Sequence, residues 1–246
     1  MTAPLVFRAP FEPDRLNLVC LPQAGADSAG FMRLIPLTAP LCSVVPVALP
    51  GRAMRLEEPV PDRLEDMADE IFEALAKQLI PPYALVGSSM GGWLGYEICK
   101  RIELAGLPAP IALVLVVSPT PDTPRALPDL TQKTSAECAT LLRNFNPTLA
   151  PALEHDELLE LVLPTIRADF AACLSYHPAH IPIKTDILAF SGLKDPVVTA
   201  EKMKGWRNWT EGDFRLTQLP GDHSLLDTPP AGLTQNLRSL AGRALA

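Results

Sequence analysis

The chain has 246 residues, 48% of them hydrophobic and 20% charged, which suits one folded α/β domain with or without an inserted subdomain and excludes wholesale disorder. A formal net charge of −7 makes nucleic acid and anionic membrane poor candidates for partners. No apolar run is long enough for a signal peptide at the amino terminus or for a membrane span elsewhere, so we expect a cytoplasmic protein.

Short, nearly continuous apolar runs predict strands that are buried on both faces, as in a parallel sheet. In chain order these runs are Leu16–Leu21, Val44–Leu49, Ala84–Val86, Ile111–Val117, Ile187–Phe190 and Phe214–Leu219. A central strand needs every backbone N–H, which proline lacks. We therefore expect the second strand to begin after Pro46 or to bulge there.

Helices are predicted between these strands. From Leu64 to Leu79 apolar residues recur at three- and four-residue spacing along one helical face, and Asp62 with Glu65 resembles a capping box at the start. The residues after Ser89, as far as Gly106, predict the next helix. Strands that alternate with helices in this way indicate an α/β fold with a doubly wound, mostly parallel sheet.

The stretch 119–182 breaks the alternation, because it contains helical patterns and no convincing strand. These patterns cover Ser135–Phe145, His155–Leu163 and Thr165–Ser175. We interpret 119–182 as a helical lid inserted into a core made of residues 1–118 and 183–246, lying over the carboxyl edge of the sheet.

The five cysteines are scattered along the chain and never spaced as CxxC. They are Cys20, Cys42, Cys99, Cys138 and Cys173. This pattern predicts reduced, mostly buried thiols in a cytoplasmic protein rather than a catalytic or metal-binding set.

The segment Gly87-Ser88-Ser89-Met90-Gly91 matches G-x-S-x-G between a predicted strand and a predicted helix. A sharp strand-to-helix turn needs neighbours without side chains and lifts the central serine above the sheet, as in the α/β-hydrolase fold. Ser89 is therefore the candidate nucleophile, and the Met90 N–H at the start of the helix is a candidate oxyanion donor. The alternative is a glycine-rich turn in which Ser89 only caps the helix.

A neutral serine needs a general base, and the α/β-hydrolase order is serine, acid, histidine. Only one of the four histidines, His223, lies outside the predicted lid, in a turn after Phe214–Leu219. Asp195 lies in the loop after Ile187–Phe190 and is the first choice for the acid, with Asp222 as the second.

The second oxyanion donor is expected in the loop after the first strand, where Leu21-Pro22-Gln23-Ala24-Gly25 bends sharply. We assign it to the Ala24 N–H, with Gln23 as the alternative. An ordinary loop would have a similar sequence.

Together these segments resemble the type II (external) thioesterases of polyketide and nonribosomal peptide biosynthesis. The matching motifs are LPQAG, LPGRAMR (Leu49–Arg55), GSSMG, LPTIRADF (Leu163–Phe170), SGLKDPVV and GDHS, in the family's order and over nearly the whole chain. Three residues depart from the family pattern: Ser88 stands for a histidine, Ala53 for a glycine or glutamate, and Ala26 for a glycine. These departures bear on substrate preference and on the shape of the oxyanion loop.

The resemblance implies hydrolysis of acyl, aminoacyl or peptidyl thioesters from the 4′-phosphopantetheine arm of a carrier protein, usually to edit stalled or misprimed synthases. The implied partner is an acyl or peptidyl carrier protein of a polyketide synthase or nonribosomal peptide synthetase. Ser89 would attack the thioester with His223 as base, and no metal or soluble cofactor would be needed. The alternatives are a general carboxylesterase or lipase, a product-releasing or cyclising thioesterase, and a non-catalytic binding protein on the same fold.

Apolar spacing in the lid suggests an acyl channel lined by Phe145, Leu158 and Phe170, and Gln23 is a further candidate for substrate contact.

Two pairs of other residues stand out in the sequence. Arg52 and Arg55 could meet a phosphate or an acidic carrier protein, or be solvated loop residues. Trp206 and Trp209 are predicted to be packing residues on a surface helix.

Overall fold

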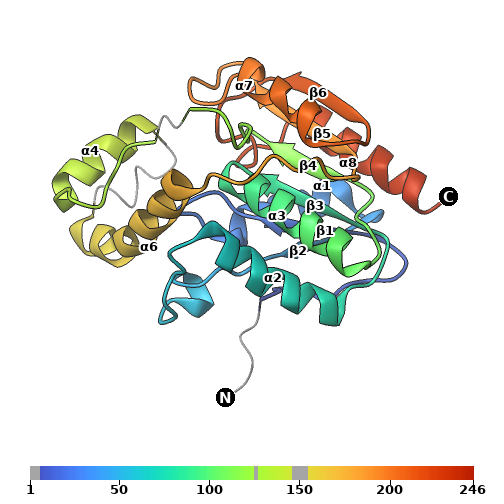
Figure 1. The fold of residues 1–246 in the computed structure, drawn as a ribbon, viewed down its shortest axis with the longest axis horizontal. Coiled ribbons are helices and arrows are strands. Elements are labelled where there is room, and N and C mark those ends of the chain that lie inside the picture. The colour runs from blue at the N-terminus through green and yellow to red at the C-terminus, as the bar shows by residue number, and fades with distance from the viewer. Residues whose placement is uncertain (1–5, 125–126, 146–154) are drawn as a thin grey trace.

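Six parallel strands form one sheet in the order β2-β1-β3-β4-β5-β6 (Figure 1). The computed structural model describes residues 6–124, 127–145 and 155–246. The strands are β1 (Leu16–Leu21), β2 (Cys42–Pro46), β3 (Tyr83–Ser88), β4 (Leu113–Val116), β5 (Ile187–Gly192) and β6 (Phe214–Leu219). Each predicted apolar run overlaps one of these strands, which confirms the predicted α/β fold.

The second strand differs from the prediction, because β2 ends at Pro46 instead of beginning after it. Strand β2 is paired with β1 alone among the six strands, and Pro46 lies opposite Cys20. On the outer side, Arg8 donates its backbone N–H to the Pro46 carbonyl at 2.9 Å. An edge strand tolerates proline because fewer of its N–H groups are needed for the sheet.

Helices cover both faces of the sheet. The core helices are η1 (Ser28–Leu34), α1 (Ile35–Thr38), η2 (Ala53–Arg55), α2 (Leu64–Gln78), α3 (Met90–Ala105), α7 (Ala200–Lys204), η4 (Gly205–Trp209) and α8 (Ala231–Ala244). The predicted capping box at α2 is wrong: Arg63 is the N-cap, and no side chain caps that helix end. The Glu65 carboxylate instead forms an ion pair with Arg63 at 3.3 Å.

Side chains of successive strand residues enter two separate cores, one on each face of the sheet. In β1, Leu16, Leu18 and Cys20 pack with η1 and α8, whereas Val19 and Leu21 pack with α2 and α3. This alternation follows from the two-residue period of a strand. Because both faces of β1 are covered, its residues are apolar apart from Asn17.

The tryptophans and the cysteines were also predicted to lie in the core. Trp206 and Trp209 are buried, and the Trp206 Nε1–H donates to the Ser118 carbonyl at 2.9 Å, which confirms a packing role. The five cysteines are all buried, as predicted.

Helices α4 (Ser135–Phe145) and α6 (Asp156–Ser175) lie between β4 and β5 in the chain and beside the sheet in space (Figure 1). Two predicted helical patterns are joined in α6, which continues through Pro164. Leu163 and Ile166, on either side of this proline, are both buried in a third apolar cluster that α4 and α6 share. This packing holds the helix together where proline removes one backbone hydrogen bond. The boundaries 119–182 for a separate lid stay a prediction.

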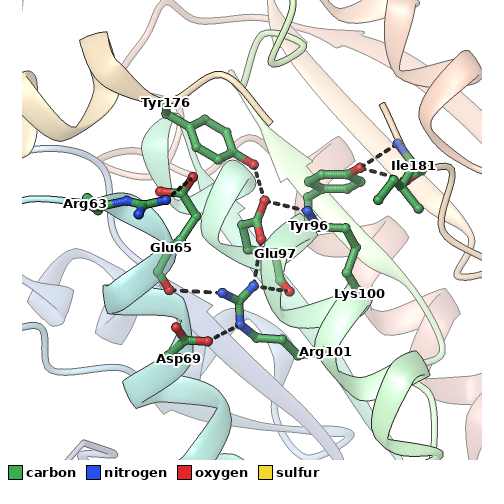
Figure 2. A network of polar contacts seen from close by, with 9 residues as sticks. All are labelled: Arg63, Glu65, Asp69, Tyr96, Glu97, Lys100, Arg101, Tyr176 and Ile181. Atoms are coloured by element: carbon green, nitrogen blue, oxygen red, sulfur yellow. Dashed lines mark hydrogen bonds and ion pairs between the residues drawn. The ribbon is translucent and has the colours of Figure 1, made fainter. Parts of the chain in front are cut away.

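The segment that returns from α6 to the sheet is anchored on α3. Figure 2 shows the Tyr176 hydroxyl directed at Glu97, to which it donates a hydrogen bond at 2.7 Å. Further along, the Tyr96 hydroxyl donates to the Ile181 carbonyl at 2.7 Å. The Glu97 carboxylate, with 3% of its side chain exposed, also forms ion pairs with Lys100 at 2.7 Å and Arg101 at 2.6 Å.

Replacing Glu97 by glutamine is expected to lower the free energy of unfolding at pH 7 by about 1–3 kcal/mol, since buried partners lose a charged acceptor. Burial alone would raise the pKa of the Glu97 carboxyl, but the hydrogen bonds that it accepts, from Lys100 first, lower the pKa below its ordinary value. A lowered pKa in the folded state stabilises the protein above the unfolded-state pKa of about 4.3, and this contribution disappears as the pH falls through the folded-state pKa. Urea denaturation at a series of pH values should therefore show the gap between the two proteins closing in acid.

The matched control is Glu201→Gln, which removes the exposed ion pair with Lys204 and is expected to leave the urea midpoint nearly unchanged. A gap between Glu97→Gln and the unaltered protein that stayed constant from pH 7 to pH 3 would contradict the assigned shift.

Candidate active site

The order of the strands places a crevice between β1 and β3. The chain goes from β1 to β2 on one side, then crosses to β3 on the other side of β1. In open α/β sheets, ligands bind at the carboxyl ends of the strands where the order reverses in this way. The loop after β1 carries Ala24, and the turn after β3 carries Ser89, so both lie at this position.

Ser89 occupies a strained turn between β3 and α3. Its φ of 50° and ψ of −114° lie outside the regions that residues with side chains usually adopt. The Ser89 N–H donates to the Val116 carbonyl at 2.9 Å, and its carbonyl accepts from the Ser118 hydroxyl at 2.8 Å. Both contacts come from the end of β4, and they hold the bend from the neighbouring strand.

Glycines make this bend possible because the backbone segments approach each other closely. A Cβ atom at Gly87 would lie 2.2 Å from the Gly91 carbonyl oxygen, and one at Gly91 would lie 2.1 Å from the Leu21 carbonyl oxygen. No side chain fits at these distances. The spacing G-x-S-x-G is therefore a steric requirement of the turn.

Asp195 and His223 lie in contact, although 28 residues separate them in the chain. The His223 Nδ1 is 2.8 Å from Asp195 Oδ2, and both side chains are buried. The other carboxylate oxygen of Asp195 accepts the N–H groups of Val197 at 2.8 Å and Val198 at 2.9 Å. These two amides fix the carboxylate so that it faces the imidazole. Asp222, the second choice for the acid, is exposed and accepts the Ser224 N–H at 2.9 Å.

The loops that carry the candidate residues border one small cavity. Its volume is about 50 Å³, and its lining includes Gln23, Ser88 and Ser224, which are the chain neighbours of Ala24, Ser89 and His223. The acid loop joins the histidine loop through the Lys194 N–H, which donates to the Gly221 carbonyl at 2.9 Å. The fold thus brings the turn after β3 and the loops after β1, β5 and β6 together at one edge of the sheet.

The two candidate oxyanion donors come from the start of α3 and from the loop after β1. Met90 is the first residue of α3, so its N–H has no acceptor within the helix. Ala24 is partly buried, while the amides of the next two residues are engaged: Gly25 donates to Asp169 at 2.7 Å, and Ala26 donates to the Gln23 carbonyl at 3.1 Å.

The candidate substrate residues do not all lie at one place in the structure. Phe170 packs inside the cluster shared by α4 and α6, with 2% exposed, and Leu158 is 46% exposed on α6. Phe145 ends α4, and its side chain is outside the described residues. Gln23 lines the small cavity, where its Oε1 is 3.5 Å from the Ser88 hydroxyl.

A larger cavity, of about 350 Å³, lies between α6 and the loops after β1 and β2. Its lining residues are Gly25, Asp27, Gly51, Arg52, Ala53, Leu56, Leu161, Val162 and Thr165. Leu161 and Val162 follow Leu158 in α6, so the cavity uses a part of this helix that the apolar spacing did not single out.

The interpretation of the two arginines as solvated loop residues is wrong, and their contact with a phosphate or a carrier protein stays a prediction. Arg52 is 7% exposed and pairs with Asp169, while Arg55 is 4% exposed and pairs with Glu58 and Glu70. Neither guanidinium is solvated, and each is already bound to carboxylates within the chain. Two of these partners, Asp169 on α6 and Glu70 on α2, lie far away in the chain, and local sequence could not identify them. Glu58 lies only three residues after Arg55.

Asp169 is a buried residue of the site region that the sequence analysis did not single out. It is fully buried within α6, between Ile166 and Cys173 on the same helical face. A carboxylate in the middle of an apolar helical face signals a buried, paired charge, because a lone buried charge is costly.

Within residues 6–124, 127–145 and 155–246, no cluster of three or more histidine, cysteine, aspartate or glutamate side chains could hold a metal ion. In the same part of the chain, no helix combines the length and apolar character that a membrane span requires.

Comparison with known proteins relates the whole chain to one family. Residues 16–239 match the family model described as the thioesterase domain. The gramicidin S biosynthesis protein GrsT of Aneurinibacillus migulanus is 30% identical over 216 residues, which cover 86% of this chain and 83% of GrsT.

Two solved structures have the same fold over nearly their full length. The RedJ thioesterase from the prodiginine pathway of Streptomyces coelicolor is 32% identical with a TM-score of 0.85, covering 97% of this chain and 95% of RedJ. The type II thioesterase BorB from the borrelidin cluster is 30% identical with a TM-score of 0.85, covering 98% of this chain and 99% of BorB.

Proposed function

The chain belongs to the thioesterase family of α/β-hydrolases, among the type II thioesterases of nonribosomal peptide and polyketide clusters, and we propose that it hydrolyses acyl thioesters held on carrier proteins. The substrate would be an acyl, aminoacyl or peptidyl group on a 4′-phosphopantetheine arm. The proposed role is to clear stalled or misprimed groups from a synthase in the cytoplasm. The partner follows from the kind of pathway that the relatives' names state.

The contact between His223 and Asp195, beside the strained turn at Ser89, carries the proposal. In the proposed first step, the Ser89 hydroxyl oxygen attacks the thioester carbonyl while the Nε2 of His223 takes its proton. Asp195 holds the Nδ1–H and stabilises the imidazolium that forms. The N–H groups of Met90 and Ala24 donate to the oxyanion.

The tetrahedral intermediate then collapses. The carbon–sulfur bond breaks, the departing thiolate takes the proton from His223, and the acyl group remains on Ser89 as an ester. A water molecule next attacks this ester and gives its proton to His223. That proton returns to the Ser89 oxygen as the acid leaves.

The decisive assay offers one acyl group in three forms: on a carrier protein, on free pantetheine and as an oxygen ester. The carrier-bound thioester should be hydrolysed fastest, and comparison with free pantetheine measures what the carrier contributes. Ser89→Ala supplies the background rate. Equal or faster cleavage of the oxygen ester would instead identify a general carboxylesterase, and a cyclic product detected by mass spectrometry would identify a cyclising enzyme.

A further inference from the structure

A buried ion pair joins α6 to the loop after β2. Arg52 Nη1 is 2.8 Å from Asp169 Oδ2, and Arg52 Nη2 is 2.8 Å from Asp169 Oδ1, so the contact is bidentate. The exposed fraction is 8% for the arginine side chain and zero for the aspartate. The two residues are 117 positions apart in the chain.

The same pair forms hydrogen bonds with two successive residues of the loop after β1. The Gly25 N–H donates to Asp169 Oδ2 at 2.7 Å, and Arg52 Nη1 donates to the Ala26 carbonyl at 3.2 Å. Arg52 Nε also donates to the Pro50 carbonyl at 3.1 Å, which fixes the guanidinium plane. The Gly25 N–H directly follows Ala24, and the Ala26 carbonyl belongs to the second residue after it.

Holding Gly25 restrains the direction of the Ala24 N–H. The peptide unit between Ala24 and Gly25 is planar, so once its N–H is bound to Asp169, only φ and ψ of Ala24 separate it from the Ala24 N–H. The loop also lies against α6, since a Cβ at Gly25 would be 2.8 Å from Ile166 Cγ1. Gly25 has a φ of +72°, a backbone conformation that this turn needs and that glycine adopts without steric cost.

We propose that Arg52 and Asp169 are positioning residues that hold the Ala24 N–H in its oxyanion-binding orientation. The proposal rests on the proposed function, in which Ala24 is one of the two oxyanion donors. It makes α6 part of the catalytic machinery, because a side chain of that helix orients a donor of the core.

The chemistry of the Arg52–Asp169 pair favours a role in orienting the loop over a role in stabilising the fold. Replacing a buried ion pair by apolar side chains is often neutral for stability, because desolvation offsets the attraction between the charges. A guanidinium–carboxylate fork, however, fixes both partners in one plane. Here the Oδ2 of Asp169, which binds Arg52 Nη1, also accepts the Gly25 N–H.

Two conservative variants are expected to weaken the hydrogen bonds of the pair with the loop after β1. In Arg52→Lys an ammonium group replaces the fork and cannot bind both carboxylate oxygens in one plane. In Asp169→Asn one oxygen becomes an amide nitrogen, so the side chain can no longer accept from both Arg52 nitrogens and from Gly25. Matched controls are Arg55→Lys, which changes the other buried arginine of the same loop, and Glu97→Gln, which changes a buried, ion-paired carboxylate on α3.

The readouts separate orientation from folding. An alkyl boronic acid forms a B–O bond with the Ser89 oxygen, whose proton passes to His223, and the resulting tetrahedral adduct places an oxygen at the oxyanion position. For Arg52→Lys and Asp169→Asn we expect kcat to fall about 10–100-fold while KM changes less than about threefold. The boronate inhibition constant should weaken by the same factor as kcat, whereas both controls should stay within about threefold of the unaltered protein for either quantity.

A measurement on the unaltered protein keeps the proposal testable if a variant does not fold. The Gly25 amide proton should exchange with solvent at least about 100-fold more slowly than exposed loop amides, since it is bound to a buried carboxylate. Fast exchange at Gly25 would overturn the proposal.

Two further outcomes are decisive. If Ser89→Ala is inactive but Arg52→Lys and Asp169→Asn match their controls in kcat and boronate binding, the positioning role is wrong and the proposed function stands. If Ser89→Ala retains turnover, the proposed function fails, and the positioning role fails with it.

Discussion

Replacing Ser89 by alanine is expected to lower the single-turnover rate of thioester hydrolysis by about 10⁶-fold, the loss typical of removing a triad nucleophile. The residual rate would come from substrate binding and from the oxyanion donors, which the substitution leaves in place. Binding of the loaded carrier protein should change little, because no bond to Ser89 forms before the chemical step. Mass spectrometry at early times should find the acyl group on the Ser89 peptide in the unaltered protein and not in the variant.

The adjacent serine supplies the matched control. Ser88 is buried and its hydroxyl contacts Gln23 at 3.5 Å, but it ends β3 and does not occupy the strained position. Ser88→Ala should lower the rate less than about tenfold, an effect smaller than the loss of one oxyanion donor. A loss of rate as small as tenfold in Ser89→Ala would refute the assignment of the nucleophile. A loss in Ser88→Ala as large as that in Ser89→Ala would refute it too.

Asp195→Asn is expected to lower kcat by about 10⁴-fold through the tautomer of His223. The N–H groups of Val197 and Val198 both point at Oδ1, so the asparagine carbonyl should remain there and its NH₂ should face the histidine. The Nδ1 of His223 would then have to accept a hydrogen bond, which places the ring proton on Nε2. In that tautomer the imidazole cannot take the proton of Ser89.

Two observations check this explanation. The ¹⁵N chemical shifts of the His223 ring should report protonated Nδ1 in the unaltered protein and protonated Nε2 in the variant. Asp222→Asn is the matched control, because it changes an exposed aspartate next to the histidine and should leave kcat within about threefold. A similar loss at Asp222 would show that the acid was wrongly chosen.

Most of the strands and the nucleophile turn could be predicted because their signals are local. β1 coincides with its predicted run, since a strand covered on both faces requires almost continuous apolar residues. β6 also coincides with its predicted run, although it is a partly exposed edge strand. G-x-S-x-G could be recognised because the close approach of the backbone at Gly87 and Gly91 excludes a Cβ atom. These requirements apply to neighbours in the chain and are therefore written in the sequence.

Errors arose where a local signal competed with distant packing. The second strand was expected to begin after Pro46 or to bulge there, but β2 ends at Pro46 and lies at the edge of the sheet, where the lost N–H matters less. Two separate helical patterns were predicted, ending at Leu163 and beginning again at Thr165, but buried residues on both sides of Pro164 keep α6 continuous. A proline indicates what the backbone loses, and only the surrounding structure decides whether that loss is compensated.

The sequence by itself determined the parallel sheet, the bend at Ser89 and the candidates Asp195 and His223, because each depends on spacing within a few residues or on position after a strand. Only the tertiary structure decided which charges meet. Arg52 and Asp169 form a pair across 117 residues, and the contact selects Gly25 as their third partner. A buried charge must find a partner, but which one it finds depends on the crossing of helices and loops that no local pattern encodes.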